Sequence, residues 1–278
     1  MTSRMRARPL AAALTVAALA AASLAGGASA QQDRTQAEIE RYREMLKDGN
    51  PAELVSAKGE VLWKTRRGPK NASLEQCDLG KGPGVVKDAY AELPRHFADT
   101  DQVMDFESRL VHCMVTLQGM DRDQLTRAPF SGEGQPATDL ETLTAYVVEE
   151  SRGTTISVPQ KHPKEVAAFR RGEKMFYFRG GTHDFACATC HAEDAKRIRL
   201  QDLPNLTQTL GAQKAYTTWP AYRVSQGELR SFQWRLNDCF RQQRFPELVF
   251  GSDASIALTM FLAHNANGAA FDAPAIKR

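Results

Sequence analysis

A short motif in the second half of the chain, Cys187-Ala-Thr-Cys190-His191, constrains the fold more than any other feature of the sequence. Two cysteines three positions apart, followed directly by a histidine, are the attachment pattern of a c-type haem. The thiols bond to the haem, and the imidazole of His191 supplies one axial ligand to the iron. The motif therefore predicts a mainly helical, cytochrome c-like domain. It leaves open which residue binds the other face of the iron.

The first thirty residues predict export. Arg4, Arg6 and Arg8 precede a short alanine-rich apolar run, and Ala28-Ser29-Ala30 then matches a cleavage site. This is the pattern of a secretory signal peptide, with a retained membrane anchor as the alternative. The run is short for a membrane span, and no later segment is long enough to be one. We expect a cleaved signal peptide over residues 1–30 and a periplasmic mature protein outside the membrane, the compartment in which c-type haem is attached.

The net charge gives no reason to expect a polyanionic partner. The formal charge of +3 at pH 7 disappears with the predicted signal peptide, which contains three arginines and no acids. A mature chain near neutrality does not favour binding to nucleic acid or to an anionic membrane. Its length suffices for one large or two ordinary domains.

Hydrophobic periodicity after the signal peptide favours helices separated by loops. We expect helices over Thr35–Lys47, Lys164–Phe178 and Asp253–His264, the second with Pro163 near its start and Gly180-Gly181 at its end. One helix before the C-x-x-C-H motif and another at the end of the domain are the layout of a small cytochrome c.

The first half of the chain resembles a degenerate copy of the second, which indicates an internal duplication. Gly59 stands eighteen positions before Cys77, the spacing that separates Gly172 from Cys190. Farther along, FESRLVHC resembles FQWRLNDC, with a shared phenylalanine, Arg-Leu pair and terminal cysteine. These landmarks occur in one order in both halves.

Only the second copy is expected to bind haem. In the shared register Leu74 falls on Cys187 and Asp78 falls on His191, so the first copy lacks one thiol and the axial imidazole. A two-domain haem peroxidase, which needs a haem in each half, is excluded on the same ground.

We therefore predict a mainly α fold of two tandem cytochrome c-like domains, joined between Glu149 and Pro163. Residues 31–155 form the first, degenerate and without haem. Residues 156–278 form the second, with one covalently bound haem c.

Five cysteines, an odd number, require an explanation in an exported protein. Haem attachment uses Cys187 and Cys190. In a domain without haem, Cys77 and Cys113 can approach each other, and an oxidising compartment favours a disulfide between them. Two separate buried thiols are the alternative. Cys239 then remains unpaired, in register with Cys113 and therefore expected near the haem plane.

Cys239 is our candidate for the second axial ligand, with a buried structural cysteine as the alternative. Methionine is the usual ligand, but Met260 lies inside a predicted helix, where core packing is the simpler role, and Met175 precedes the haem motif. His264 lies at a helix end, and His183 lies beside the motif as a surface or supporting residue.

The chain around Cys239 is rich in arginine. Basic side chains lower the pKa of a thiol, and guanidinium groups bind oxyanions. If this segment is helical, Arg235 lies on the same face as Cys239. For Arg241 and Arg244, a solvated basic face is an equally good explanation. Arg235 matches Arg109 in the first copy, so a packing role common to both copies is its alternative. The arginines of this region are Arg223, Arg230, Arg235, Arg241 and Arg244.

The sequence resembles the SoxA family, the larger subunit of the SoxAX cytochrome of thiosulfate-oxidising bacteria. The resemblance covers nearly the whole mature chain and rests on CDLGKGPGV, CATCH and the RLNDC run that ends at Cys239. It implies a subunit of an L-cysteine S-thiosulfotransferase in its single-haem form. It also implies a heterodimer with a SoxX-like small cytochrome c, and coupling of thiosulfate to a cysteine thiol of a SoxYZ-like carrier protein.

Carried over by position, the resemblance makes Cys239 a haem ligand and the catalytic cysteine, found in the family as a persulfide. Arg235 becomes the residue that positions the substrate. A thiolate ligand lowers the reduction potential of haem iron, so we expect this haem to have a structural or tuning role, with electrons passing to the partner haem. The alternatives are a simple electron-transfer cytochrome and a binding subunit that positions another haem protein.

Overall fold

The structure, a computed structural model, describes residues 49–198 and 201–277, with isolated positions before residue 49. The predicted signal peptide and most of the predicted helix Thr35–Lys47 lie outside the described residues. The chain from Gly49 onward forms one unit that is mainly helical. No helix in the described part of the chain has the length and apolar character needed to cross a membrane.

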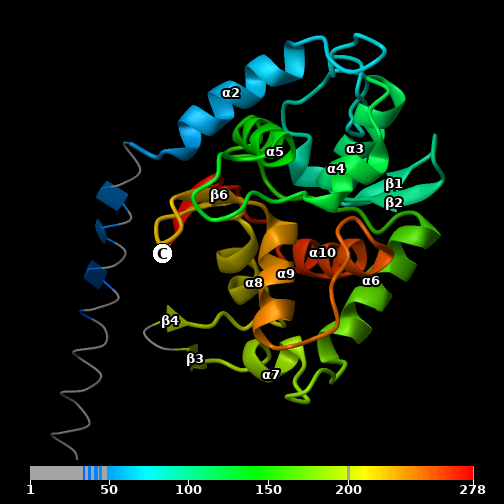
Figure 1. Ribbon diagram of the computed structural model, residues 1–278. Helices are drawn as coiled ribbons and strands as arrows, with labels where there is room; N and C mark the ends of the chain where they lie inside the picture. Colours follow the sequence, from blue (N-terminus) through cyan, green and yellow to red (C-terminus); the bar gives the residue numbers. More distant parts are fainter. Residues whose placement is uncertain are drawn as a thin grey trace, which may run out of the picture. The chain divides into compact units, whose positions relative to one another are not determined.

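In the first half of this unit, α2 (Ala52–Lys64) packs against α5 (Asp139–Glu149) (Figure 1). Gly59 lies where the two helices cross, and a Cβ atom there would come within 2.3 Å of the carbonyl oxygen of Thr142. The two backbones therefore approach as closely as they do because this residue has no side chain.

In the second half, α6 (Pro163–Tyr177) packs in the same way against α10 (Asp253–Asn265). Gly172 lies at this crossing, where a Cβ atom would come within 2.0 Å of the carbonyl oxygen of Ala257. α6 begins with Pro163 in its first turn, and the backbone N–H of His162 donates to the carboxylate of Glu165. Both helices predicted here from hydrophobic periodicity are confirmed to within a residue or two.

A short antiparallel hairpin precedes a helix in the first half. β1 (Arg95–Phe97) pairs with β2 (Gln102–Met104), and α3 (Phe106–Thr116) follows. The side chain of Asp105 begins α3 by accepting a hydrogen bond from the backbone N–H of Ser108 at 3.0 Å. An acceptor at this position satisfies a helix N–H group that would otherwise have no partner.

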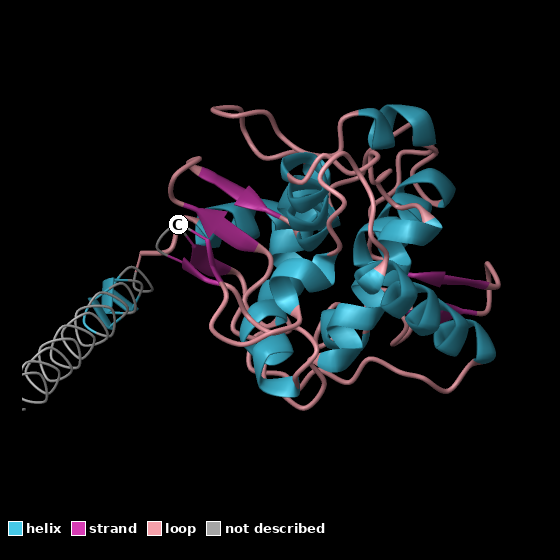
Figure 2. Cartoon of the chain, turned by 90° about the horizontal axis from the view of Figure 1, so that it is seen from below, coloured by secondary structure: helices cyan, strands magenta, loops and turns pink. Residues whose placement is uncertain are grey.

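The second half has the same hairpin and helix. β5 (Ala221–Arg223) pairs antiparallel with β6 (Glu228–Arg230), and α9 (Phe232–Gln242) follows with Ser231 as its N-cap. A parallel strand near the C-terminus, β7 (Ala275–Lys277), pairs with β5, so the strand order is β6-β5-β7. Figure 2 shows these strands together at one side of the helices.

The remaining elements are short, and one of them is the haem motif itself. They are η1 (Tyr90–Glu92), α4 (Arg122–Arg127), α7 (Cys187–His191), β3 (Arg197–Ile198), β4 (Gln201–Asp202) and α8 (Thr209–Tyr216).

Buried apolar side chains from both halves form one continuous cluster. The ring of Tyr90 in the first half lies 5.4 Å from the ring of Phe271 in the second, and Tyr216 lies 5.8 Å from that same ring. The halves therefore share a core, and neither buries its apolar face alone.

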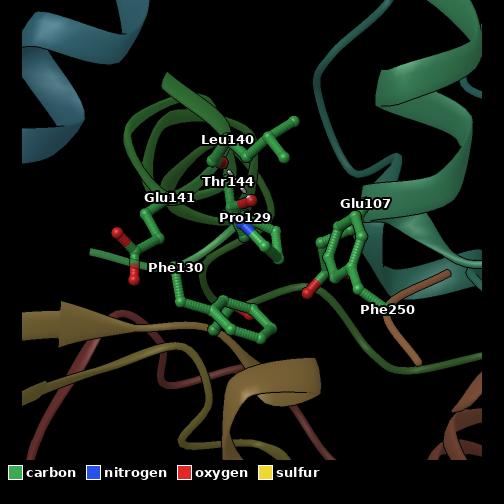
Figure 3. A pocket seen from close by; sticks show the side chains of 8 residues that line it. Glu107, Pro129, Phe130, Leu140, Glu141, Thr144 and Phe250 are labelled. Carbon is green, nitrogen blue, oxygen red and sulfur yellow. Dashed lines mark hydrogen bonds between the residues drawn. The ribbon is translucent and has the colours of Figure 1, made fainter. Parts of the chain in front are cut away.

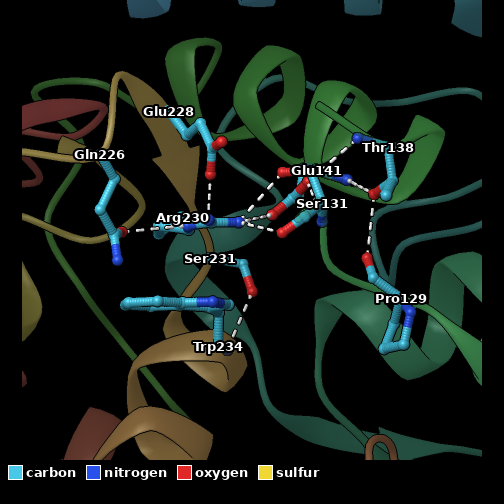
Figure 4. A network of polar contacts seen from close by, with 9 residues as sticks. All are labelled: Pro129, Ser131, Thr138, Glu141, Gln226, Glu228, Arg230, Ser231 and Trp234. Atoms are coloured by element: carbon cyan, nitrogen blue, oxygen red, sulfur yellow. Dashed lines mark hydrogen bonds and ion pairs between the residues drawn. The ribbon is translucent and has the colours of Figure 1, made fainter. Parts of the chain in front are cut away.

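A buried ion network also joins the halves (Figure 4). The guanidinium of Arg230 on β6 donates to the carbonyl oxygen of Ser131 at 2.7 Å and to the carboxylate of Glu141 on α5 at 3.3 Å. It also contacts the carboxylate of Glu228 and lies 4.8 Å above the ring of Trp234. One cation thus serves two buried carboxylates.

Candidate functional site

The two thiols of the haem motif lie on the single turn of α7. Cys187 and Cys190 are unpaired and partly buried. The hydroxyl of Thr189 accepts a hydrogen bond from the backbone N–H of Ala186 at 2.9 Å and so closes the start of this helix. α7 packs against α6. A spacing of three places both thiols on one face of the turn, as attachment to two sites on one haem requires.

The third residue of the motif is oriented by a backbone carbonyl. Nδ1 of His191 lies 2.9 Å from the carbonyl oxygen of Pro204. Because a carbonyl only accepts, Nδ1 carries the proton, and the lone pair of Nε2 remains for a metal. Burial lowers the pKa of His191, the Pro204 hydrogen bond opposes this, and the Arg235 guanidinium lowers the pKa further. The imidazole is therefore held in the neutral form that ligates iron.

Pro204 could not be identified as a site residue from the sequence. Its contribution is a backbone carbonyl, which every residue has, so the residue type gives no signal. Only the path of the loop between α7 and α8 brings this carbonyl to His191.

Cys239 and Arg235 lie one turn apart on α9, as the spacing predicted. Cys239 is near enough to Cys187 and Cys190 that these thiols affect one another's pKa. Arg235 in turn affects the pKa of both Cys239 and His191. The fold therefore brings the two parts of the predicted site, α7 and α9, together.

Nearby arginines lower the pKa of Cys239, as expected, but in the protein chain by itself the net pKa is raised. Burial raises the pKa of this thiol, and its effect exceeds the opposing effects of Arg235 and Arg223. Burial likewise raises the pKa of Cys187 to about 12. Desolvation disfavours the thiolate more strongly than these guanidinium groups favour it. Both thiols are therefore protonated until a bond to carbon or a metal replaces the proton.

Asp238 organises the arginines beside Cys239. Its carboxylate accepts from Arg235 at 2.9 Å, from Arg241 at 2.6 Å and from Gln242 at 2.7 Å. In the sequence, Asp238 stands as one acid among several arginines. Its spacing of three from both Arg235 and Arg241 was the available signal, because residues three apart are neighbours on a helix.

The other candidates for the distal ligand have different surroundings. Met260 is fully buried, and its sulfur lies 3.2 Å from the side-chain amide of Gln160. Nδ1 of His264 lies 3.1 Å from the carbonyl oxygen of Val158. Met175 packs against the core, and His183 is exposed.

These residues fit a c-type haem. The motif offers two free thiols and a neutral imidazole, and Cys239 offers a sulfur on the facing helix. Apolar side chains such as Leu206 and Phe240 pack nearby as part of the core. In the described part of the chain, this site included, no group of three or more His, Cys, Asp or Glu side chains is arranged to hold a metal ion.

The corresponding positions in the first half do not fit a haem. Leu74 is buried, and the carboxylate of Asp78 accepts from the backbone N–H groups of Gly80 at 2.7 Å and Gly82 at 2.9 Å. The predicted disulfide between Cys77 and Cys113 is present, with a Cα–Cα distance of 5.6 Å.

A small pocket lies away from the haem motif, between α5 and the start of α9 (Figure 3). One carboxylate oxygen of Glu107, which lines this pocket, is buried without a hydrogen-bond partner. The remaining lining residues are Pro129, Phe130, Leu140, Glu141, Thr144, Ser231 and Phe250. No residue of the predicted site lines this pocket.

Comparison with known proteins gives one consistent family. Residues 58–156 match the family described as SoxA/TsdA, cytochrome c domain. The chain is 52% identical over 240 residues to the L-cysteine S-thiosulfotransferase subunit SoxA of Hydrogenophilus thermoluteolus, and the match covers 86% of this chain and 87% of that protein. It is 28% identical to the subunit of the same name from Allochromatium vinosum, over 84% of this chain and 76% of that protein.

A solved structure shares the fold. The structure described as the crystal structure of SoxXA from P. pantotrophus superposes with a TM-score of 0.69 and 22% sequence identity, and it covers 86% of this chain and 84% of that chain.

Proposed function

The chain belongs to the SoxA family, and from this we propose that it is the subunit of an L-cysteine S-thiosulfotransferase that carries the reactive cysteine. The proposed reaction couples thiosulfate oxidatively to a cysteine thiol of a SoxYZ-like carrier protein. The observation that carries the proposal is the convergence of Cys239 and Arg235 on α9 with the haem motif on α7. A simple electron-transfer cytochrome needs no such arginine and no such thiol.

We propose one covalently bound haem c as the cofactor. Cys187 and Cys190 would attach it, and His191 and Cys239 would bind its iron. When bound, the haem supplies an iron centre that ligates sulfur and exchanges single electrons. The chain's own contributions are the Pro204 carbonyl, which fixes the imidazole tautomer, and the buried surroundings that keep water from the sulfur.

The overall reaction balances as follows. The outer sulfur of thiosulfate forms a sulfur–sulfur bond with the carrier thiol, which loses its proton, and two electrons leave for c-type haems. Cys239 would first bond to the outer sulfur of thiosulfate with release of the two electrons to c-type haems. The carrier thiolate would then attack that outer sulfur, and the Cys239 sulfur would leave as a thiolate. The Arg235 guanidinium, 28% exposed, faces solvent enough to meet the sulfonate oxygens of an incoming substrate.

We also propose that the unit consists of two tandem cytochrome c-like domains, residues 31–155 and 156–278, of which the first has no haem. Two matched helix crossings support this, one at Gly59 and the other at Gly172. The shared order of hairpin and helix supports it as well. The match of residues 58–156 to a cytochrome c domain falls in the half that lacks the haem motif.

The compartment and the partners are part of the same proposal. A cleaved signal peptide over residues 1–30 would place the protein in the periplasm, where haem attachment and the Cys77–Cys113 disulfide are both chemically favoured. A SoxX-like cytochrome c is the proposed partner in a heterodimer, because the superposed structure is described as SoxXA.

The test is thiosulfate-dependent electron transfer by the complex with its SoxX-like partner and SoxYZ-like carrier. We expect the Cys239→Ser variant to keep its covalent haem and lose this activity, and its ferric EPR spectrum to lose the features of thiolate ligation. Unchanged activity and an unchanged spectrum would make the protein an electron carrier without sulfur-transfer chemistry.

A further inference from the structure

Arg223, the last residue of β5, is a second arginine beside Cys239, and the function proposed above gives it no role. Cys239 and Arg223 are near enough to affect one another's pKa, and Arg235 lowers the pKa of Arg223. The backbone of Arg223 pairs with Glu228 on one side and with Lys277 on the other. Its Cα position is therefore fixed by the central strand of the sheet.

The guanidinium of Arg223 lacks a carboxylate partner among the described residues. Its Nε is buried and has no hydrogen-bond acceptor. A buried donor without an acceptor is costly, so it is rare in native proteins and calls for an explanation. Burial lowers the pKa of this arginine, and Arg235 and Arg230 lower it further, whereas Asp238 and Cys239 raise it.

The neighbouring arginines, unlike Arg223, have carboxylate partners. Arg230 is held by Glu141 and Glu228, and Arg235 is held by Asp238 at 2.9 Å. Asp238 is already shared with Arg241 and Gln242. Arg223 therefore has no ion-pair partner of its own within residues 49–198 and 201–277, although it lies close to a reactive sulfur.

We propose that Arg223 binds the sulfonate oxygens of thiosulfate, and of the S-thiosulfonate formed from it, beside Cys239. This inference rests on the proposed function and adds a second substrate-binding residue to Arg235. Thiosulfate carries two negative charges, and Asp238 neutralises part of the charge that Arg235 offers. A second fixed guanidinium supplies the remaining compensation without rearrangement when the substrate arrives. The buried Nε gains the acceptor that it lacks.

The experiment compares Arg223→Gln, Arg223→Lys and the control Arg179→Gln in the complex with the partner cytochrome and carrier. Arg179 is an exposed arginine paired with Asp184 outside the proposed site, so its replacement removes the same charge. We expect Arg223→Gln to raise the KM for thiosulfate about 10-fold to 100-fold, as for the loss of a charge-assisted hydrogen bond, with a smaller change in kcat. Arg223→Lys should recover part of this loss, and the control should match the wild type.

A second readout measures binding without turnover. Sulfate shares the tetrahedral oxygens of the sulfonate group but has no transferable sulfur, so its inhibition constant should rise in Arg223→Gln by a factor similar to that for KM. Haem content and the ferric EPR spectrum should stay unchanged, which also shows that the variant folds.

The outcomes separate this inference from the function on which it rests. An active wild type with unchanged KM and sulfate inhibition in both Arg223 variants would overturn the role of Arg223 alone. A loss of kcat with an altered EPR spectrum would also overturn it, since Arg223 would then position Cys239. A wild type without thiosulfate-dependent activity would overturn the proposed function itself.

Discussion

The two halves of the molecule use the same pair of positions in different ways. In the first half, Cys77 and Cys113 are joined in a disulfide. In the second half, the corresponding Cys190 and Cys239 remain separate thiols near each other. Two facing cysteines bond directly where nothing lies between them. Where the proposed haem would be inserted, the same positions must stay apart.

Arg109 and Arg235, which occupy matching positions in the two halves, also differ in their surroundings. Arg109 is only 4% exposed, donates to the carbonyl oxygen of Asp78 at 2.7 Å, pairs with Asp99 at 2.8 Å and lies 4.1 Å above the ring of Phe97. Arg235 has Asp238 as its ion-pair partner and is partly exposed. A residue that recurs in both halves therefore has a packing role in one half and is available to a ligand in the other.

The largest expected difference between the halves is in activity. Cys239→Ser should lower the thiosulfate-dependent rate about a thousandfold or more, because it removes the proposed nucleophile. The double variant Cys77→Ser/Cys113→Ser should keep most of this rate at a temperature where it is folded. Steady-state rates at equal haem content measure both. An equal loss of rate in the two variants would show that the first half is as necessary for the reaction as Cys239, and not only a structural support.

The next effect concerns the buried ion network. Arg230→Met places in the second half the residue that the first half has at the matching position, Met104. It leaves Glu141 and Glu228 buried without their cation, which should lower the free energy of unfolding by about 3–5 kcal/mol. Urea unfolding followed by circular dichroism measures this. A loss below about 1 kcal/mol would mean that the network contributes little, as many exposed ion pairs do.

The disulfide of the first half should contribute somewhat less to the free energy of unfolding than the Arg230 ion network does. It closes a loop with a sequence separation of 36 residues, for which chain entropy gives about 3–4 kcal/mol of stabilisation. Thermal unfolding of Cys77→Ala/Cys113→Ala should show this loss with the haem absorption spectrum intact. A changed haem spectrum in the folded variant would show that the first half controls the haem environment directly.

The smallest expected effect, at most about 1.4 kcal/mol per pH unit, is on the pH dependence of stability through Glu107, which corresponds to Gln233 in the second half. Burial, and to a smaller extent the nearby Asp105 carboxylate, raises the pKa of Glu107 to about 8. The folded protein therefore retains a proton that the unfolded chain releases near pH 4.5, the ordinary value for this side chain. The stability that this proton contributes is complete below about pH 4.5 and is lost as the pH rises towards 8.

Glu107→Gln makes this position match the second half and removes the titration. The slope of unfolding free energy against pH between about 5 and 8 should become less negative by up to about 1.4 kcal/mol per pH unit, the share of one proton. Chemical denaturation of both proteins across this range measures the slope. Parallel curves would show that Glu107 is ionised in the folded protein.

Much of the fold could be predicted from the sequence because its signals are local. The C-x-x-C-H motif, the apolar spacing of residues 163–177 and 253–265, and the order of landmarks in the two halves depend on positions close together in the chain. The disulfide followed from the repeat, since Cys77 and Cys113 occupy matched positions. Spacing also placed Arg235 and Cys239 on one face of a helix.

The tertiary structure decided what depends on many neighbours at once. The sequence shows the arginines around Cys239, but only the packed structure shows that burial exceeds their effect on its pKa. It also decides that Arg109 is enclosed, that the buried Nε of Arg223 has no acceptor among the described residues, and that the Pro204 carbonyl reaches His191. Desolvation and hydrogen bonding sum over all groups around an atom, and most of those groups come from distant parts of the chain.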